Sequence, residues 1–424
     1  MYHVGSSVAL TGFLNQTAAV MFRFAFLSLI SFTLLTSVCG SVLAQSGGSQ
    51  AVEKPKRQPP PVMDSVNGAM QRYVAKGRAA GAVTLVAHRG KVVHFGAVGL
   101  RDIESDKKMQ RWTRFAIASM TKPITATAVM ILHEQGKLDV NDPLEKYLPE
   151  FGNVRLKSGD EVSRKLTIRD ALTHTSGIVG DQVFRGSLAD HVTEVASRPL
   201  GFQPGDKWQY SPGVSVAGRV VEVVSGQPFE DFLRERIFQP LGMSKTTFRP
   251  DGKGVANLAV IYQPGENEGT LSPAGNRIST FTEEDGPNPS GGLVSTAQDL
   301  FRFYQMVLNG GEFRGQRVLS SQSVQMMVSP QIGDLETGFT PGNTWGLGWC
   351  IVKEPQGVTK MLSTGTYGHG GAFGTQGWVD PVEETIFILL IQRTNMGNSD
   401  GSEMRGEFQA VAVEALAKTD SLPQ

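Results

Sequence analysis

The chain has 424 residues, of which 40% are hydrophobic and 19% are charged. This composition is typical of a globular protein with a large core and excludes disorder of the whole chain. Forty basic residues balance forty acidic ones, and the basic cluster Lys54, Lys56 and Arg57 is too short for the electrostatic footprint of a nucleic-acid-binding protein.

Residues 1–44 have the order of a secretory signal. Arg23 precedes an apolar stretch over 24–38, and small residues follow up to Ala44. We expect cleavage after Ala44 and export to the periplasm or the extracellular space, with no stable membrane insertion afterwards. An uncleaved segment would instead anchor the protein in a membrane.

The first predicted elements are a linker, a helix and a hairpin. Residues 45–61 are rich in Ser, Gly, Gln, Lys and Pro and predict a linker. From 62 to 76 apolar residues recur at three- and four-residue intervals, as in an amphipathic helix. The apolar runs 82–87 and 92–95 are joined by Arg89-Gly90, which predicts a β-hairpin.

The middle of the chain is predicted to be helical and rich in loops. Residues 119–135 follow a helical pattern with one apolar face and Gly136 as the C-cap. Thr167 begins a capping pattern with Asp170. Further helices are predicted at 215–225, 229–237 and 297–308.

The C-terminal part returns to strands. Strands are predicted at 346–352, 375–379 and 385–391, and a closing helix at 402–418. Because strands lie near both chain ends, residues 62–424 are expected to form one α/β (α+β) domain with a mixed, mainly antiparallel sheet flanked by helices. The α/β part would comprise 62–150 and 290–424, and the helical subdomain 151–289.

The most informative segment for chemistry is Ser119-Met-Thr-Lys122. Ser119 lies where an extended segment leads into a helix, whose dipole favours developing negative charge. Three residues span about one helical turn, so we expect the Lys122 amine beside the Ser119 hydroxyl. A serine needs such a group to take its proton before it attacks a carbonyl. By itself, however, Ser-x-x-Lys is common, and a helix N-cap followed by an exposed lysine would explain it better.

Two later segments favour the catalytic interpretation over the helix N-cap. Tyr210 supplies an aromatic hydroxyl at a loop-to-helix junction, and Tyr-Gly-His-Gly-Gly-Ala at 367–372 precedes strand-like sequence. The three elements occur in the order that a serine acyl-transfer site needs.

With these motifs the chain resembles the class C β-lactamases, the family VIII carboxylesterases and the related D-alanyl-D-alanine carboxypeptidases. The resemblance runs from about Asp64 to the last helix. It includes Leu-Thr-His-Thr-Ser-Gly at 172–177, Phe-Gln-Pro-Leu-Gly-Met at 238–243, Pro-Ser-Gly-Gly-Leu at 289–293 and Trp-Gly-Leu-Gly-Trp at 345–349. It implies that Ser119 is the nucleophile, Lys122 its partner, and Tyr210 the general base that later reprotonates the leaving group.

The resemblance also assigns the binding residues. His369, Gly370 and Gly371 stand at the strand motif that binds substrate in the family. The backbone N–H groups of Ala372 and Ser119 would form the oxyanion hole.

Two positions depart from the family pattern. The β-lactamases usually read Tyr-x-Asn, whereas here the third position is Pro212, which offers neither a side-chain amide nor a backbone N–H. His369 stands where many members have lysine, and histidine is at most partly charged near neutrality. Both departures argue against efficient β-lactam hydrolysis and leave the acylation residues intact.

Other chemistries have less support. Gly-x-Ser-x-Gly is absent, and His133-Glu134 lacks the second histidine of a zinc-protease helix, so we expect neither a metal ion nor a cofactor. Cys350 is expected to be a small buried hydrophobe. His174 is predicted to be a structural residue of a turn.

The leading hypothesis is an exported serine esterase or amidase that forms an acyl-enzyme at Ser119 and acts on a small-molecule ester or amide. A β-lactamase or D-Ala-D-Ala carboxypeptidase, acting on a β-lactam or peptide, is the alternative within the same chemistry. A catalytically silent binding or scaffolding member is a further alternative, although such members usually lose the serine, lysine or tyrosine.

Overall fold

A computed structural model describes residues 63–274 and 285–420 of the chain. The signal segment 1–44 and the linker 45–61 lie outside the described residues and stay predictions. No helix within the described ranges is long and apolar enough to cross a membrane.

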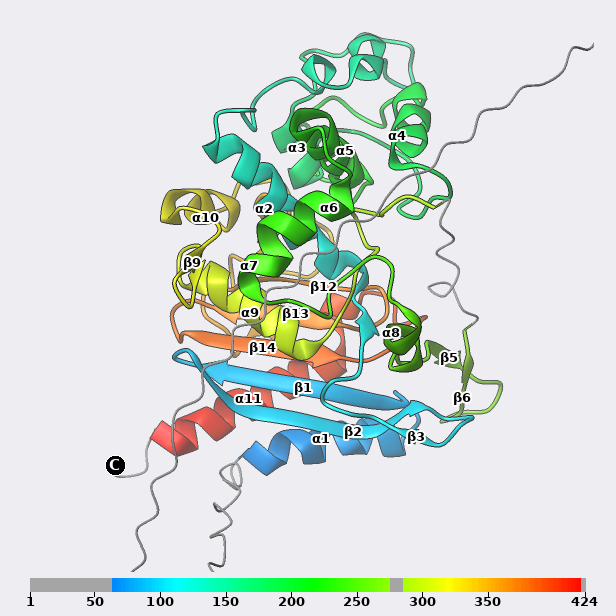
Figure 1. Cartoon of the computed structure of the whole chain (residues 1–424), viewed down its shortest axis with the longest axis vertical. Helices are drawn as coiled ribbons and strands as arrows, with labels where there is room; N and C mark the ends of the chain where they lie inside the picture. Colours follow the sequence, from blue (N-terminus) through cyan, green and yellow to red (C-terminus); the bar gives the residue numbers. More distant parts are fainter. Residues whose placement is uncertain (1–62, 275–284, 421–424) are drawn as a thin grey trace, which may run out of the picture. The chain divides into compact units, whose positions relative to one another are not determined.

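The main sheet has eight strands in the order β10-β11-β12-β13-β14-β1-β2-β3 (Figure 1). They are β1 (Gly81–His88), β2 (Lys91–Asp102), β3 (Lys107–Lys108), β10 (Asn343–Trp345), β11 (Cys350–Val352), β12 (Tyr367–Gly370), β13 (Gln376–Asp380) and β14 (Thr385–Leu390). As predicted, both chain ends contribute, and they meet where β1 pairs with β14 in the register Leu85↔Ile388. Each neighbouring pair is antiparallel, so the sheet is antiparallel throughout and not mixed.

Two turns decide where these strands begin and end. The predicted hairpin is confirmed, with Arg89 and Gly90 both at positive φ (50° and 74°), as a tight turn between twisted strands requires. The prediction of one strand over 346–352 is wrong. Gly348 has φ 73° and the N–H of Gly346 donates to the oxygen of Trp349 over 2.8 Å, so the chain reverses between β10 and β11.

One face of the sheet is covered by α1 (Asp64–Ala75) and α11 (Glu403–Asp420), which come from the two ends of the domain (Figure 1). The helices predicted at 62–76 and 402–418 are therefore confirmed. Trp378, Phe387 and Phe408 belong to the core between these helices and the sheet. Alternate residues of β14 contribute to this core and to the one on the opposite face, because side chains alternate along a strand.

The opposite face is covered by α9 (Ala297–Leu308) and α2 (Thr121–Glu134), with the helical region beyond them (Figure 1). That region contains α3 (Ile168–Thr173), α4 (Leu188–Ser197), α5 (Gly213–Ser225), α6 (Phe229–Leu233), the π-helical turn η5 (Arg234–Phe238) and α7 (Gln239–Leu241). The predicted Thr167–Asp170 capping box is present at the start of α3. The helices expected at 215–225, 229–237 and 297–308 are also found.

The remaining elements are short. They are the helices α8 (Gly252–Ala256) and α10 (Ser321–Met327), the 3-10 turns η2 (Ala118–Met120), η3 (Leu144–Lys146), η4 (Pro149–Asn153), η6 (Gly357–Thr359) and η7 (Ser399–Gly401), and the strand pairs β4 (Phe115–Ala116) with β7 (Val294–Ser295), β5 (Tyr262–Pro264) with β6 (Leu271–Pro273), and β8 (Glu312–Phe313) with β9 (Gln316–Arg317).

Helix α2 differs from its predicted amphipathic character. Every residue from Thr121 to Leu132 is buried, not only one apolar face. The helix is enclosed because it packs on α5 and α6 on the side away from the sheet. Polar side chains of α2 form hydrogen bonds inside the protein. For example, Thr125 Oγ1 donates to the backbone oxygen of Pro289 over 2.7 Å.

Candidate active site

Ser119 lies in η2, directly before α2. Residues 115–118 and 120–132 are buried, whereas Ser119 is partly exposed. Ala118 has φ 43°, in the left-handed region that residues with a Cβ rarely adopt. This strained turn brings Ser119 to the surface of an otherwise buried segment.

Lys122 follows one helical turn later, and its side chain reaches back to Ser119. Its Nζ lies 3.2 Å from Ser119 Oγ and 2.7 Å from the backbone oxygen of Ser290. The side chain is fully buried, and this burial lowers the pKa of Lys122 to about 7, although the charge of Asp400 opposes the shift. A sizeable fraction of Lys122 is therefore neutral near pH 7 and can accept a proton.

The segment 289–293 holds this arrangement in place. The N–H of Ile117 donates to the oxygen of Leu293 over 3.0 Å, and the Ser290 oxygen orients the amine of Lys122. In the sequence this segment is recognisable only as a landmark of the family, and nothing local indicates the role of the Ser290 carbonyl.

Tyr210 lies over Lys122 in the segment that precedes α5. The centre of its ring is 4.6 Å from Lys122 Nζ. Its hydroxyl is buried and, within the described ranges, no group meets it in hydrogen-bond geometry. Burial raises the pKa of Tyr210, and the nearby Ser119 opposes the rise. The phenol is therefore protonated near neutral pH, and the structure brings together the three residues that the sequence singled out.

The predicted binding residues lie on β12 and in the turn that follows it. His369 is buried and its Nδ1 lies 2.6 Å from the oxygen of Gly370. Burial lowers the pKa of His369 to about 4, so its imidazole is neutral near pH 7. His369 thus offers no positive charge to a substrate carboxylate.

Gly370 and Gly371 are glycines because their neighbours come very close. A Cβ at residue 370 would lie 1.6 Å from Asp400 Oδ1, and one at residue 371 would lie 2.4 Å from the Ile117 oxygen. Gly371 therefore packs against the segment that leads to Ser119. Ala372 is exposed in the turn between β12 and β13, and within the described part of the chain its N–H donates no backbone hydrogen bond.

Asp400 is a buried acid that the sequence analysis missed. It is 1% exposed, and its Oδ1 accepts a bond from Gln376 Nε2 over 3.3 Å. Its charge raises the pKa of both Lys122 and His369 against the effect of burial. In the sequence, Asn-Ser-Asp before a helix looks like an ordinary capping segment, so nothing local indicated this position.

Aromatic side chains surround Tyr210. Trp345 is fully buried, as expected for a strand residue, yet its ring centre lies 6.2 Å from that of Tyr210. Trp208 and Phe339 are partly exposed, and their ring centres lie 6.2 Å and 5.2 Å from that of Tyr210. An apolar wall therefore borders the site.

An antiparallel sheet built from both chain ends, with a serine and a lysine one turn apart at the start of a buried helix, defines a serine hydrolase of the β-lactamase fold. The chain belongs to the beta-lactamase family, whose model matches residues 66–412.

The chain is also similar to several known proteins. The chain is 31% identical over 365 residues to the protein Rv1367c of Mycobacterium tuberculosis, which covers 78% of this chain and 90% of that protein. It is 30% identical over 362 residues to the esterase EstB of Burkholderia gladioli, with 76% and 88% covered. Among solved structures, EstCE1, described as a hydrolase with promiscuous acyltransferase activity, has a TM-score of 0.72 at 24% identity and covers 83% of this chain and 98% of that chain.

Proposed function

We propose that this protein is a carboxylesterase-like serine hydrolase in which Ser119 attacks the carbonyl carbon of a small ester or amide. The observation that carries the proposal is the 3.2 Å distance between Ser119 Oγ and Lys122 Nζ. Burial lowers the pKa of that amine to about 7, so a proton acceptor stands beside the hydroxyl at neutral pH.

Neutral Lys122, and not Tyr210 as the family resemblance implies, takes the proton of Ser119 as the Oγ–C bond forms, because burial keeps the Tyr210 phenol protonated. The oxyanion of the tetrahedral intermediate is stabilised by the backbone N–H groups of Ser119 and Ala372. Protonated Tyr210 donates its proton to the leaving oxygen or nitrogen as that bond breaks, and Lys122 returns a proton to the phenolate. Water then attacks the acyl-enzyme by the reverse sequence and releases the acid.

A neutral substrate fits the charges of this site. His369 is uncharged near pH 7 because burial lowers its pKa to about 4, and Pro212 has no amide to bind an acylamino side chain. Recognition of a β-lactam or a peptide terminus would need a partner for its carboxylate. The relative EstB is named an esterase, which also favours an ester over the alternative substrates. Export remains a proposal that rests on the sequence of residues 1–44.

The first test is hydrolysis of a short-chain p-nitrophenyl ester and of a chromogenic cephalosporin by the protein and by Ser119→Ala. We expect the ester to be the better substrate and Ser119→Ala to lower kcat by about 10³-fold or more. Ser158→Ala, a change of an exposed serine, is the matched control and should keep full activity.

The other outcomes are equally clear. Faster turnover of the cephalosporin would favour the β-lactamase alternative. Ester hydrolysis that survives Ser119→Ala would refute the mechanism, and a folded protein that neither substrate nor a fluorophosphonate modifies would favour the catalytically silent alternative.

A further inference from the structure

His174 lies beside Tyr210 and forms hydrogen bonds with the residues directly before and after it. Its own backbone oxygen accepts the N–H of Gln209 over 2.9 Å, and its Nδ1 accepts the N–H of Ser211 over 3.1 Å. Its ring packs on the Tyr210 ring with 4.5 Å between centres. The residues before and after Tyr210, and Tyr210 itself, are therefore all held by one histidine.

The position of His174 is in turn fixed by the end of α3. His174 caps this helix with φ 62° and is completely buried. The residues on either side, Thr173 and Thr175, are joined to each other by their hydroxyls over 2.8 Å, and Thr175 Oγ1 lies 3.3 Å from Asp170 Oδ1. This geometry leaves the histidine little freedom to move.

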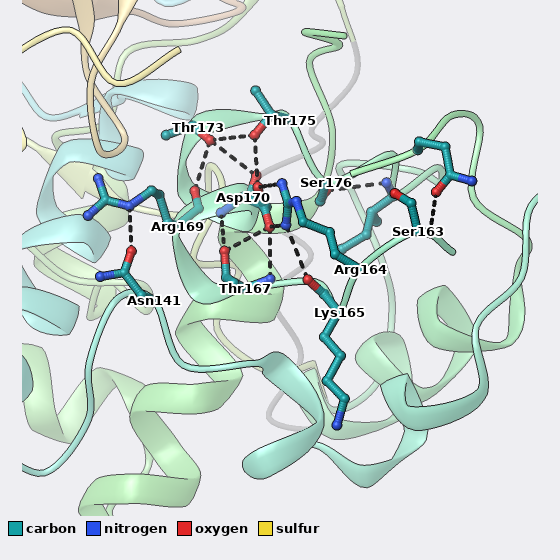
Figure 2. A network of polar contacts seen from close by, with 12 residues as sticks. Asn141, Ser163, Arg164, Lys165, Thr167, Arg169, Asp170, Thr173, Thr175 and Ser176 are labelled. Carbon is teal, nitrogen blue, oxygen red and sulfur yellow. Dashed lines mark hydrogen bonds and ion pairs between the residues drawn. The ribbon is translucent and has the colours of Figure 1, made fainter. Parts of the chain in front are cut away.

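Asp170 is the centre of that network (Figure 2). Its two carboxylate oxygens accept bonds of 2.6 Å and 2.8 Å from the guanidinium of Arg164. Oδ2 also accepts the N–H and the hydroxyl of Thr167, at 2.9 Å and 2.7 Å. A buried carboxylate with this many donors is a rigid anchor, and it lies four residues before His174.

The bond from Ser211 assigns the tautomer of His174. Because Nδ1 accepts an N–H, the ring proton must be on Nε2. Burial lowers the pKa of His174 well below its usual range, and the neighbouring Lys122 and His369 act in the same direction. The ring therefore stays neutral and Nδ1 remains an acceptor across the neutral pH range.

We propose that His174 is a positioning residue that holds the Tyr210 hydroxyl where it can deliver a proton to the leaving group. This inference rests on the proposed function, because it assumes the role of Tyr210 as proton donor. His174 is completely buried, and within the described residues its ring nitrogens form hydrogen bonds to neither Ser119 nor Lys122. The turn residue expected from the sequence thus acts through Tyr210.

Leaving groups of different basicity can reveal such a role. An alkoxide needs a proton as its bond to carbon breaks, whereas p-nitrophenolate leaves as a stable anion. Displacement of Tyr210 should therefore lower kcat/KM, which reports acylation, much more for an alkyl ester than for a p-nitrophenyl ester with the same acyl group. A general loss of folded protein would slow both esters equally.

The variants His174→Gly and His174→Asn separate the acceptor from the backbone conformation. Both residues tolerate the positive φ of position 174, but only asparagine offers an oxygen in place of Nδ1. His191→Asn is the matched control. His191 is another buried histidine, but its ring stacks on that of Phe184, with 4.0 Å between ring centres, and not on that of Tyr210.

For His174→Gly we expect kcat/KM on the alkyl ester to fall about 10- to 100-fold, with a much smaller loss of kcat/KM on the p-nitrophenyl ester. The ratio kcat/KM is the right quantity because it reports acylation, the step in which the two leaving groups differ, and not hydrolysis of the acyl-enzyme that the two esters share. His174→Asn should restore most of the rate that His174→Gly loses on the alkyl ester. His191→Asn should leave the ratio of the rates on the two esters unchanged. Thermal unfolding of each variant is the control that checks whether the protein is folded at the assay temperature.

Tyr210→Phe, measured in the same series, separates two kinds of failure. If Tyr210→Phe shows the selective loss but His174→Gly slows both esters equally, or His174→Asn behaves like His174→Gly, the inference about His174 is wrong. If Tyr210→Phe lowers kcat/KM of both esters to the same degree, the role of Tyr210 as proton donor in the proposed function is wrong instead.

Discussion

At the scale of single residues, burial does most to define the chemistry of the site. Lys122 and His369 are both fully enclosed, and each pKa is lowered because the protein interior solvates a charge poorly. The same physical cause leaves the two groups with different pKa values, because the unperturbed pKa of a lysine is much higher than that of a histidine. Lys122 reaches the neutral range and can exchange a proton, whereas His369 becomes permanently neutral at physiological pH.

The pH dependence of kcat/KM should report the state of Lys122. Below about pH 7 the amine is protonated and cannot accept the proton of Ser119, so we expect kcat/KM to fall about tenfold per pH unit on the acid side. Because Asp400 raises the pKa of Lys122, Asp400→Asn should move the midpoint to lower pH. Steady-state rates between pH 5 and 9 measure both.

Asp139→Asn is the control for that series, because Asp139 is an exposed acid outside the site. It should leave the midpoint in place. A rate that does not depend on pH in this range would rule out Lys122 as the proton acceptor. Equal midpoints for the Asp400 and Asp139 variants would show that Asp400 does not raise the pKa of the group that titrates.

At the scale of elements, the turn after β12 and the turn η2 are fitted to each other. Thr375 Oγ1 donates to the oxygen of Ile117 over 3.2 Å, and Gly371 packs directly on the same carbonyl. The two backbone N–H groups proposed for the oxyanion hole belong to these two turns. Their spacing therefore depends on one close backbone contact.

Gly371→Ala should disturb that contact. The added Cβ would lie 2.4 Å from the Ile117 oxygen and 2.2 Å from Thr375 Oγ1, so the turn must shift and carry Ala372 with it. Loss of one donor to an oxyanion lowers kcat by about 10²-fold, and we expect a loss of that order in ester hydrolysis with a smaller effect on KM.

Gly68→Ala, in α1, provides the comparison. Nothing lies within 4 Å of a Cβ at this position, so alanine should stabilise the helix by about 0.5–1 kcal/mol and leave kcat unchanged. Equal kcat values for the two glycine variants would mean that the contact at residue 371 does not matter for catalysis.

At the scale of the whole molecule, the sheet separates two cores. The candidate site is built by η2, α2 and the ends of β12 and β13 on one side, whereas α1 and α11 cover the other side (Figure 1). Phe408 in α11 is 1% exposed and packs edge-on against Phe387 of β14, with 6.3 Å between ring centres. Trp345 belongs to this same core, and Tyr210 packs against it, so Phe408 tests how strongly the core under α1 and α11 is coupled to the site.

Phe408→Ala should destabilise the protein without changing its chemistry. A buried phenylalanine replaced by alanine costs about 3–5 kcal/mol, which urea unfolding measures. Below the unfolding transition kcat should stay near that of the parent protein. Val382→Ala, at a position that is 66% exposed, should change neither quantity. A lower kcat in folded Phe408→Ala would show that the two faces are coupled.

The sequence by itself determined the features that depend on neighbouring residues. Helix periodicity and capping located α1, α3, α9 and α11, and Arg89-Gly90 located the first hairpin. The spacing of Ser119 and Lys122 was also readable, because one helical turn fixes their separation. The order of the three motifs then indicated the acyl-transfer site and the family.

Only the tertiary structure decided what depends on contacts distant in sequence. The strand predicted over 346–352 is divided by a turn, and α2 is buried all round because other helices enclose it. Asp400 and the Ser290 carbonyl meet Lys122 only in the folded chain. Burial, which sets the pKa of that lysine, is a property of the assembled core, since no local pattern of residues specifies how much solvent a side chain loses.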